Sequence, residues 1–183
     1  MIDKKTLRNN NRILRRKLSE CGLIEGASFN IVEKIKNWDL YKSSKNIMIF
    51  YPLKEEINLL PLAKDKNKNF YIPKCTENGS LTAHLFKSED ELIENKFKIK
   101  EPTNEAIDPS IIDIIFMPAL GADKFGNRIG YGKGYYDHFL SENKLSAKKV
   151  LIIQSALISD VEIKADEFDI KYDYLISDGL CLL

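Results

Sequence analysis

A glycine-rich segment in the second half of the chain carries the residues best suited to chemistry. Its glycines are Gly126, Gly130, Gly132 and Gly134. Glycine lets the backbone adopt positive φ and approach a ligand closely, and successive N–H groups in such a loop form an anion-binding nest. Arg128 and Lys133 add a guanidinium suited to bidentate phosphate contacts and a compact ammonium. The segment therefore predicts a phosphate-binding loop; the alternative is a tight turn that serves only packing.

This loop matches neither of the two common nucleotide-binding motifs. Residues 130–134 read Gly-Tyr-Gly-Lys-Gly, which is not the G-x-G-x-x-G fingerprint, and Gly134 stands where a P-loop needs Ser or Thr. A helix is expected from about Gly134 to Glu142, and its N-terminal dipole would add to the attraction for an anion. Phosphate binding is thus inferred from the local chemistry and not from a motif match.

Three tyrosines and one acid accompany the loop. Tyr131, Tyr135 and Tyr136 could stack on a flat heterocycle, or they could pack into the core at a helix start. Asp137 could hold Mg²⁺ beside bound phosphates, because Mg²⁺ prefers oxygen ligands. It could equally be a first-turn acid that complements the helix dipole. The sequence leaves both pairs of alternatives open.

Basic residues crowd the N-terminus, where residues 3–19 predict a helix with leucines recurring on one face. These basic residues are Lys4, Lys5, Arg8, Arg12, Arg15, Arg16 and Lys17. Lys4 and Lys5 fall in the first turn, where cations oppose the helix dipole. Lys4 and Arg8, one turn apart, could jointly meet an anionic ligand; the alternative is a solvated charged face.

Short apolar runs predict the strands that must position the loop. They cover residues 47–50, 70–72, 81–86, 111–117, 150–153 and 174–176. A second helix is expected from about Phe29 to Trp38 with Ser28 as its N-cap, and Asn58 is expected to cap a short one. Pro73 is expected to end its strand.

Continuous apolar runs that alternate with helices are typical of an α/β protein. We therefore predict a single domain over residues 1–183, with a mostly parallel central sheet flanked by helices on both faces. In such folds ligands lie beyond the carboxyl ends of the strands. The glycine-rich segment follows a strand expected to end near Met117, which places it at such an end.

Composition narrows the range of functions. The chain has 183 residues, and its 28 basic residues nearly balance its 27 acidic ones, leaving a net charge of +1. That balance argues against a general nucleic-acid binder. No stretch approaches the ~20 apolar residues of a membrane span, and the N-terminus lacks an apolar secretory region. The 3 cysteines are scattered and the 2 histidines distant, so we expect neither a disulfide framework nor a zinc site, and a cytoplasmic location.

The sequence resembles the 5-formyltetrahydrofolate cyclo-ligase family, also called 5,10-methenyltetrahydrofolate synthetases. Residues 117–140 (MPALGADKFGNRIGYGKGYYDHFL) are similar to its long glycine-rich signature, and residues 4–8 to its N-terminal nucleotide motif. Shorter similarities cover residues 49–57, 101–102 and 168–177. Two departures are Phe168, where many relatives carry His, and Lys74, where Arg is common.

The resemblance implies a NagB/RpiA/CoA transferase-like fold and the conversion of 5-formyltetrahydrofolate to 5,10-methenyltetrahydrofolate. ATP would be the cosubstrate, Mg²⁺ the cofactor, and ADP and phosphate the other products. The ATP-binding residues that it implies are Lys4, Lys5, Thr6, Leu7, Arg8, Arg128, Ile129, Gly130, Tyr131, Gly132, Lys133, Gly134, Tyr135 and Tyr136. The folate-binding residues that it implies are Tyr51, Glu56, Tyr131, Gly132, Lys133, Gly134 and Tyr135. Asp137 and Asp169 would hold Mg²⁺. We expect a monomer whose partners are reduced folate and ATP, with no nucleic-acid or membrane partner.

The implied chemistry suits these residue types. A formamide carbonyl is a poor electrophile, so phosphorylation of the formyl oxygen would create a leaving group. The neighbouring N10 amine could then close the ring, with proximity supplied by the substrate itself. Phosphoryl transfer depends mainly on positioning and charge neutralisation, which makes Lys133 and Arg128 the candidate catalytic residues.

Two other functions stay open at this point. One is a phosphosugar or acyl-CoA enzyme on a similar α/β sheet, which would use the loop for a phosphate but need no ATP. The other is a nucleic-acid-binding module built on the basic N-terminal helix, although the near-neutral net charge of +1 disfavours it.

Overall fold

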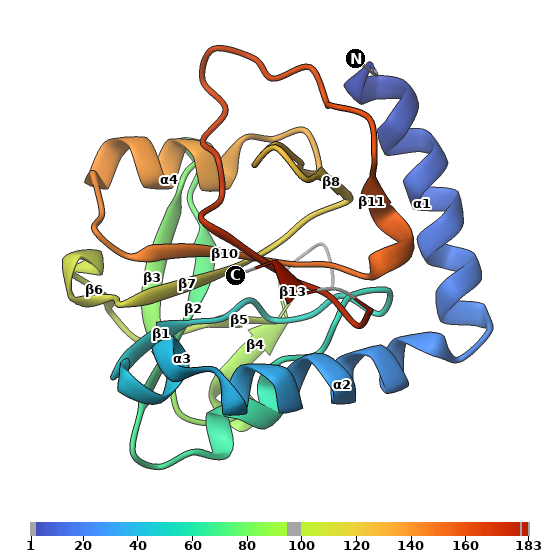
Figure 1. Cartoon of the computed structure of the whole chain (residues 1–183). Coiled ribbons are helices and arrows are strands. Elements are labelled where there is room, and N and C mark those ends of the chain that lie inside the picture. Colours follow the sequence, from blue (N-terminus) through green and yellow to red (C-terminus); the bar gives the residue numbers. More distant parts are fainter. Residues whose placement is uncertain (1–2, 95–99, 180, 183) are drawn as a thin grey trace.

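A central sheet organises the computed structural model, which describes residues 3–94, 100–179 and 181–182 (Figure 1). Among these residues the sheet has 8 strands in the order β13-β12-β10-β7-β1-β2-β3-β6. Its strands are β1 (Asn46–Met48), β2 (Asn69–Cys75), β3 (Leu81–Phe86), β6 (Ala106–Ile107), β7 (Ile114–Pro118), β10 (Lys148–Ile152), β12 (Tyr174–Ile176) and β13 (Cys181–Leu182). The pairings from β12 through β10, β7 and β1 to β2 are parallel, and those at the two edges are antiparallel. The predicted, mostly parallel sheet is confirmed.

Two smaller sheets lie outside the central one. β8 (Gly121–Asp123) pairs with β9 (Arg128–Ile129) and with β11 (Ile158–Ser159). β4 (Leu92–Glu94) pairs with β5 (Lys100–Pro102). The sequence patterns did not predict these strands, because two or three residues are too few to show a periodicity.

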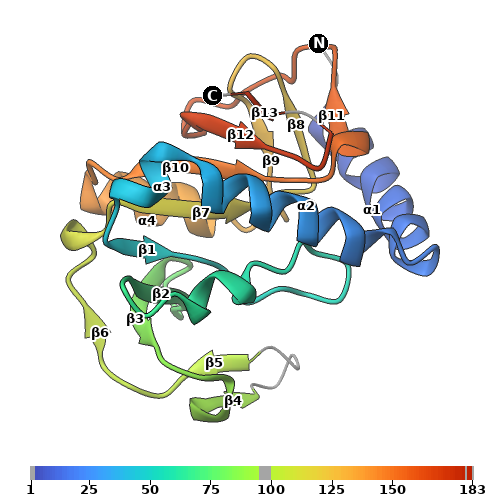
Figure 2. The same ribbon diagram turned by 60° about the horizontal axis from the view of Figure 1, so that its bottom comes forward.

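Helices cover both faces of the central sheet (Figures 1 and 2). The α-helices are α1 (Lys4–Glu20), α2 (Leu23–Asn37), α3 (Asp39–Ser43) and α4 (Tyr135–Asn143). Short 3-10 helices span Leu60–Lys64, Glu89–Glu91, Pro109–Ile111 and Ser155–Leu157. α2 and α3 lie along one face and α4 along the other, while α1 stands at the side of the molecule near β8 and β11. Among the described helices, none is long and apolar enough to cross a membrane.

Two apolar layers flank the sheet, and β7 contributes to both. Ile114 and Phe116 belong to the layer that contains α2 side chains, while Ile115 and Met117 belong to the layer that contains α4 side chains. None of these side chains is accessible to solvent. Since successive side chains of a strand point to opposite faces, a strand covered on both sides is apolar throughout. The predicted covering of the sheet on both faces is therefore confirmed.

The second helix begins earlier than expected, at Leu23, so the prediction of Ser28 as its N-cap is wrong. Gly22, at φ 69°, takes the N-cap position. Ser28 lies inside α2, where its Oγ donates to the Ile24 carbonyl (2.7 Å) and accepts from the Asn58 N–H (2.9 Å). A serine hydroxyl can bond to a carbonyl four residues back as well as cap a helix, so the residue type alone does not fix its place.

The strand expected to end at Pro73 continues to Cys75, so that prediction is also wrong. The Tyr71 carbonyl accepts from the Ile49 N–H at 2.8 Å, which turns the backbone of Tyr71 toward β1. Pro73, two residues on, faces the same side, but β1 pairs with β2 only as far as Tyr71. The N–H that proline lacks would therefore lie beyond the partner strand, and no ladder bond is lost.

Candidate active site

The glycine-rich segment follows the carboxyl end of β7, as predicted, and leads into α4. Its first part is the β8–β9 hairpin, and its second part is a loop at residues 130–134. Gly132 has φ 97°, and Gly134, the N-cap residue of α4, has φ 69°. A side chain would be strained at either position, and a Cβ on Gly134 would lie 3.3 Å from the His138 Cδ2 atom. The backbone path into the helix therefore requires these glycines.

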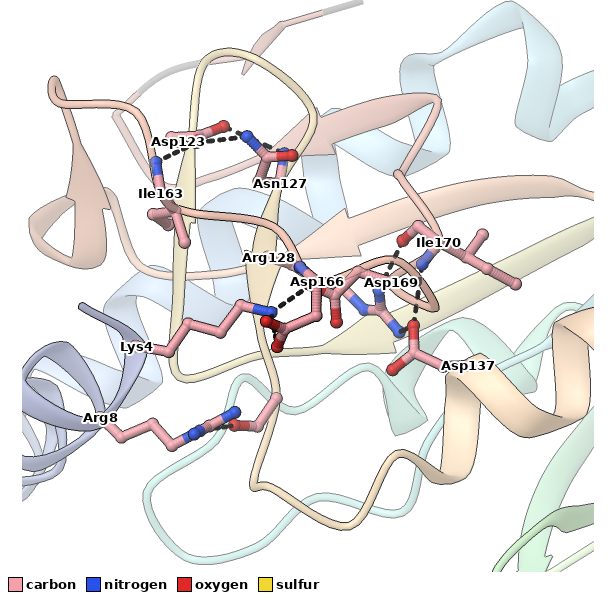
Figure 3. A network of polar contacts seen from close by, with 11 residues as sticks. Lys4, Arg8, Asp123, Asn127, Arg128, Asp137, Ile163, Asp166, Asp169 and Ile170 are labelled. Atoms are coloured by element: carbon pink, nitrogen blue, oxygen red, sulfur yellow. Dashed lines mark hydrogen bonds and ion pairs between the residues drawn. The ribbon is translucent and has the colours of Figure 1, made fainter. Parts of the chain in front are cut away.

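α1 lies against this loop, and its first turns bring one cation to the loop and another to the segment that precedes β12 (Figure 3). The buried Lys4 Nζ is ion-paired with Asp166 at 2.7 Å and with Asp169. One turn later, Arg8 Nε donates to the Gly130 carbonyl at 3.1 Å. The alternative of a solvated basic face therefore does not hold for Lys4 and Arg8, which join the N-terminus to the second half of the chain.

The residues next to Lys4 have different surroundings. Asp3 caps the start of α1: its carboxylate accepts from the Thr6 N–H (2.9 Å) and from the Thr6 Oγ1 (3.0 Å). These hydrogen bonds lower the pKa of Asp3. Leu7 packs against a small apolar cluster that includes Ile129. Lys5 is exposed to solvent. Within the predicted nucleotide motif, residues 4–8, some side chains are therefore open to a ligand and others are occupied by contacts within the protein.

Arg128 is buried, and its guanidinium is engaged at both ends. Nη1 donates to the Ile170 carbonyl at 2.6 Å, and Nη2 donates to Asp137 Oδ1 at 2.8 Å. The same carboxylate oxygen accepts from the Ile170 N–H at 3.0 Å. These three residues form a closed polar ring that joins β9, the start of α4 and the segment before β12. Arg128 is thus held in place as part of the framework, whereas the sequence suggested a guanidinium available for bidentate contacts with a phosphate.

Of the two predicted metal ligands, Asp137 belongs to this ring, and Asp169 belongs to the neighbouring group formed with Lys4 and Asp166 (Figure 3). Asp137 uses Oδ1 for the ring just described, and Asp169 uses Oδ2 for Lys4 and for the Asp166 N–H at 2.7 Å. In the described part of the chain, no cluster of three or more His, Cys, Asp and Glu side chains could hold a metal ion. Mg²⁺ is usually bound by one or two carboxylates together with substrate phosphates and water. Two carboxylates are the number usual for a magnesium ion that binds together with a nucleotide, and this role of Asp137 and Asp169 stays a prediction.

A second buried cluster joins α1 to the loop after β1. Glu56, 7% exposed, accepts from the Tyr131 hydroxyl through Oε1 and from the Leu53 N–H through Oε2 at 2.8 Å. Arg15, 2% exposed, lies 3.7 Å from Glu56 Oε1 and donates to the Tyr131 hydroxyl and to the Glu55 carbonyl. Burial, and then the charge of Glu56, raise the pKa of Tyr131. The structure thus brings together two of the predicted folate contacts, Glu56 and Tyr131.

Tyr51, the other predicted folate contact outside the glycine-rich loop, points elsewhere. Its hydroxyl donates to Glu89 Oε2 at 2.6 Å, and the Lys100 ammonium lies 5.7 Å from the centre of its ring. Burial, and then the hydrogen bond to Glu89, raise the pKa of Tyr51. The hydroxyl of Tyr51 is therefore bound on the side of β5 and not in the cluster around Glu56.

The remaining loop residues divide between solvent and core. Lys133 is exposed, and no hydrogen bond or ion pair joins it to another described residue. Tyr135 and Tyr136 pack partly against the apolar layer that contains α4 side chains, so core packing accounts for part of each ring. The Tyr136 hydroxyl is buried and has no hydrogen-bond partner among the residues that the structure describes. Burial, and then the charge of Glu56, raise the pKa of Tyr136.

Three residues whose contacts shape the surroundings of the predicted site were not singled out from the sequence, namely Asp123, Asp166 and Arg15. Asp123 is fully buried, and its carboxylate accepts from the N–H groups of Phe125 (2.8 Å), Asn127 (3.0 Å) and Ile163 (2.7 Å). An aspartate just before a glycine turn is a signal that could have indicated this role. Asp166 and Arg15 carry no comparable signal, because their partners are distant in the sequence.

Neither departure from the expected pattern lies inside these networks. Phe168, beside Asp169, is 82% exposed. The Lys74 ammonium donates to the Pro102 carbonyl at 3.1 Å and so ties β2 to β5.

Comparison with known families gives one match that spans most of the chain. Residues 1–171 match the model of the 5-formyltetrahydrofolate cyclo-ligase family. The chain is 31% identical to the 5-formyltetrahydrofolate cyclo-ligase of Mycoplasma genitalium, with 98% of this chain and 100% of that protein covered. It is 30% identical to the mouse enzyme of the same name, with 81% of each chain covered.

Solved structures agree with the sequence comparisons. The NMR structure of 5,10-methenyltetrahydrofolate synthetase from Aquifex aeolicus superposes with a TM-score of 0.84 at 29% identity, covering 98% of this chain and 91% of that one. The fold is also that of a 5,10-methenyltetrahydrofolate synthetase from Mycoplasma pneumoniae, with a TM-score of 0.76, 24% identity, and 97% and 99% of the two chains covered. Of the functions left open by the sequence, these comparisons favour the folate-dependent ligase.

Proposed function

Because the chain belongs to the 5-formyltetrahydrofolate cyclo-ligase family and acts as a ligase that forms 5,10-methenyltetrahydrofolate, we propose that ATP and Mg²⁺ drive its reaction. One observation carries this proposal. α1 places Arg8 at the glycine-rich loop and Lys4 at Asp166 and Asp169. It also places Arg15 at Glu56, so one helix borders both the proposed nucleotide region and the proposed folate region. Two adjacent sites are what a reaction between a nucleotide and a folate requires.

The nucleotide is proposed to bind between the start of α1 and the glycine-rich loop. The residues involved are Lys4, Lys5, Thr6, Leu7, Arg8 and residues 128–136. Arg8 already donates to the Gly130 carbonyl of the loop, and Gly134 is the N-cap residue of α4, whose N-terminal dipole favours a phosphate. The free ammonium of Lys133 adds a cation that no described residue neutralises. This arrangement supports a site for the triphosphate chain.

Magnesium is proposed to bind at Asp137 and Asp169, together with the nucleotide. When bound, it supplies positive charge that offsets the charge of the phosphates. Arg128 holds the Asp137 carboxylate, whereas Lys4 occupies the Asp169 carboxylate in an ion pair that the magnesium nucleotide would have to open. Arg128 then supports catalysis from the framework, while Lys133 is the cation best placed to follow the transferred phosphoryl group.

The folate is proposed to contact Glu56, Tyr51 and residues 131–135. Glu56 can accept from the amino and ring N–H groups of the pterin, a charge-assisted contact, once the Tyr131 hydroxyl yields that position. The formyl oxygen attacks the γ-phosphorus of ATP, an O–P bond forms, and ADP leaves as its P–O bond breaks. N10 then forms a bond to the formyl carbon, phosphate leaves with the formyl oxygen, and N10 releases its proton.

A direct assay tests this proposal. Mixing the protein with ATP, Mg²⁺ and 5-formyltetrahydrofolate should produce the absorbance of the methenyl product, and omission of either ATP or Mg²⁺ should abolish it. Product formation without ATP would contradict the proposed energy source. The expected monomeric state and cytoplasmic location stay predictions, and size-exclusion chromatography with light scattering checks the first.

A further inference from the structure

Arg15 is a buried cation for which the proposed reaction has no direct use. Only 2% of its surface is exposed. Burial of a guanidinium is unfavourable unless it is paired and hydrogen-bonded. Its partners are the Glu55 carbonyl at 3.2 Å, the Tyr131 hydroxyl, and Glu56 Oε1 at 3.7 Å, and its central carbon lies 5.6 Å from the centre of the Tyr131 ring. Apart from the Glu55 carbonyl, these partners all belong to Glu56 and Tyr131, the two residues proposed to contact the folate.

Neighbouring basic residues of α1 show that this placement is particular to Arg15. The Arg16 side chain is 73% exposed, and its ion pair with Glu55 is long, at 4.0 Å. Arg12 is exposed and makes a 3.5 Å contact with the Tyr131 carbonyl, a main-chain atom. The first turns of α1 therefore lie at the proposed nucleotide region. Of these three arginines, Arg15 alone lies in the buried cluster at Glu56.

We propose that Arg15 is a positioning residue for the folate, one that holds the Glu56 carboxylate and the Tyr131 hydroxyl where the pterin is recognised. This inference rests on the proposed function. When the pterin takes the Oε1 atom of Glu56 from Tyr131, Arg15 and the Leu53 N–H keep the carboxylate in one orientation. Without Arg15, Glu56 loses its neighbouring cation, and Tyr131 loses the donor that fixes its hydroxyl.

The test compares Arg15→Met, Arg15→Lys and a matched control, Arg16→Met, which removes a neighbouring exposed guanidinium. Calorimetry measures the Kd of 5-formyltetrahydrofolate, and steady-state assays measure the KM values of folate and ATP. We expect Arg15→Met to weaken folate binding about tenfold or more while the KM of ATP changes less than about twofold. Arg15→Lys should recover part of the affinity, and Arg16→Met should match the wild type.

Urea unfolding of each variant separates positioning from folding. If Arg15→Met does not fold, the folate Kd is measured for Arg15→Lys and Tyr131→Phe instead. Both substitutions keep the buried volume nearly unchanged. Equal losses for folate and ATP, or an unchanged folate Kd in a folded Arg15 variant, would overturn the inference while the proposed function stands. A wild-type protein that neither binds 5-formyltetrahydrofolate nor forms product would overturn both.

Discussion

Lys4 and Asp169, which the family resemblance assigns to different ligands, are ion-paired with each other in the structure. Asp166 shares the same ammonium at 2.7 Å. Burial alone would lower the pKa of Lys4, but the two carboxylates outweigh it and raise that pKa. The proposed phosphate-binding cation and a proposed magnesium ligand therefore neutralise each other, and a magnesium nucleotide has to separate them.

Replacement of Lys4 should affect Mg²⁺ and ATP in opposite directions. In Lys4→Ala, Asp166 and Asp169 lose their cation, so Mg²⁺ without nucleotide should bind more tightly, while ATP should bind more weakly. Calorimetry with each ligand alone measures both. Lys5→Ala, which removes an exposed neighbouring ammonium, is the control and should change the Mg²⁺ affinity little. Weaker Mg²⁺ binding in Lys4→Ala would contradict the expectation that Lys4 competes with Mg²⁺ for the carboxylates.

Lys133 should matter far more for turnover than another exposed lysine. Lys133→Ala removes the cation proposed to follow the transferred phosphoryl group, and we expect kcat to fall about 10²-fold, the usual effect of one charge-stabilising donor. Lys87→Ala removes an exposed lysine outside the glycine-rich loop and should leave kcat unchanged. Steady-state assays of the methenyl product compare the two. Similar small effects would remove Lys133 from the proposed mechanism.

Two tyrosines offer a test that separates stability from activity. The hydroxyls of Tyr41 and Tyr136 are both buried without a hydrogen-bond partner among the described residues. Removing an unpaired buried hydroxyl should leave stability unchanged or raise it, so neither Tyr41→Phe nor Tyr136→Phe should lower the urea midpoint. Tyr136 lies in the proposed site, whereas Tyr41 packs in the opposite apolar layer. We expect only Tyr136→Phe to lower kcat/KM; equal activity in both variants would exclude a role for the Tyr136 hydroxyl.

Asp123 should be a stability residue and not a catalytic one. Its buried carboxylate holds the N–H groups of Phe125, Asn127 and Ile163, and Asp123→Ala would leave these donors unpaired. We expect the free energy of unfolding to fall by about 2–4 kcal/mol. Asp160→Ala removes an aspartate whose only ion pair in the described residues is an exposed one with Lys124, and it should show no measurable loss. Urea denaturation measures both variants.

Alkaline pH should lower the free energy of unfolding, because the Tyr172 hydroxyl ionises there. Burial, and then the charge of Asp123, raise the pKa of Tyr172 to about 12. A raised pKa means that the neutral form is favoured by folding, so its contribution is complete below the unfolded value of about 10 and is lost as pH rises toward 12. Urea midpoints at pH 8 and 11 should therefore differ, and the difference should shrink in Tyr172→Phe. An equal difference in that variant would contradict the assignment.

The sequence by itself determined the class of the fold and the position of the principal loop. Central strands such as β7 are covered on both faces, so their apolar character is local and visible without a partner. The glycines at positions 132 and 134 are likewise local, because each is required by its own φ. For the same reason the course of the glycine-rich loop could be predicted from the residues alone, while phosphate binding by this loop stays a prediction.

Only the tertiary structure decided which charged side chains are buried in ion pairs and which are exposed to solvent. Arg128, Arg15 and Lys133 look alike in the sequence, yet two are buried in ion pairs and one is exposed. The partners of Lys4 and Arg15 lie far along the chain, and no local periodicity encodes such contacts. The role of a charged side chain depends on its burial and its counterion, and both are set by packing between elements that meet only when the chain folds.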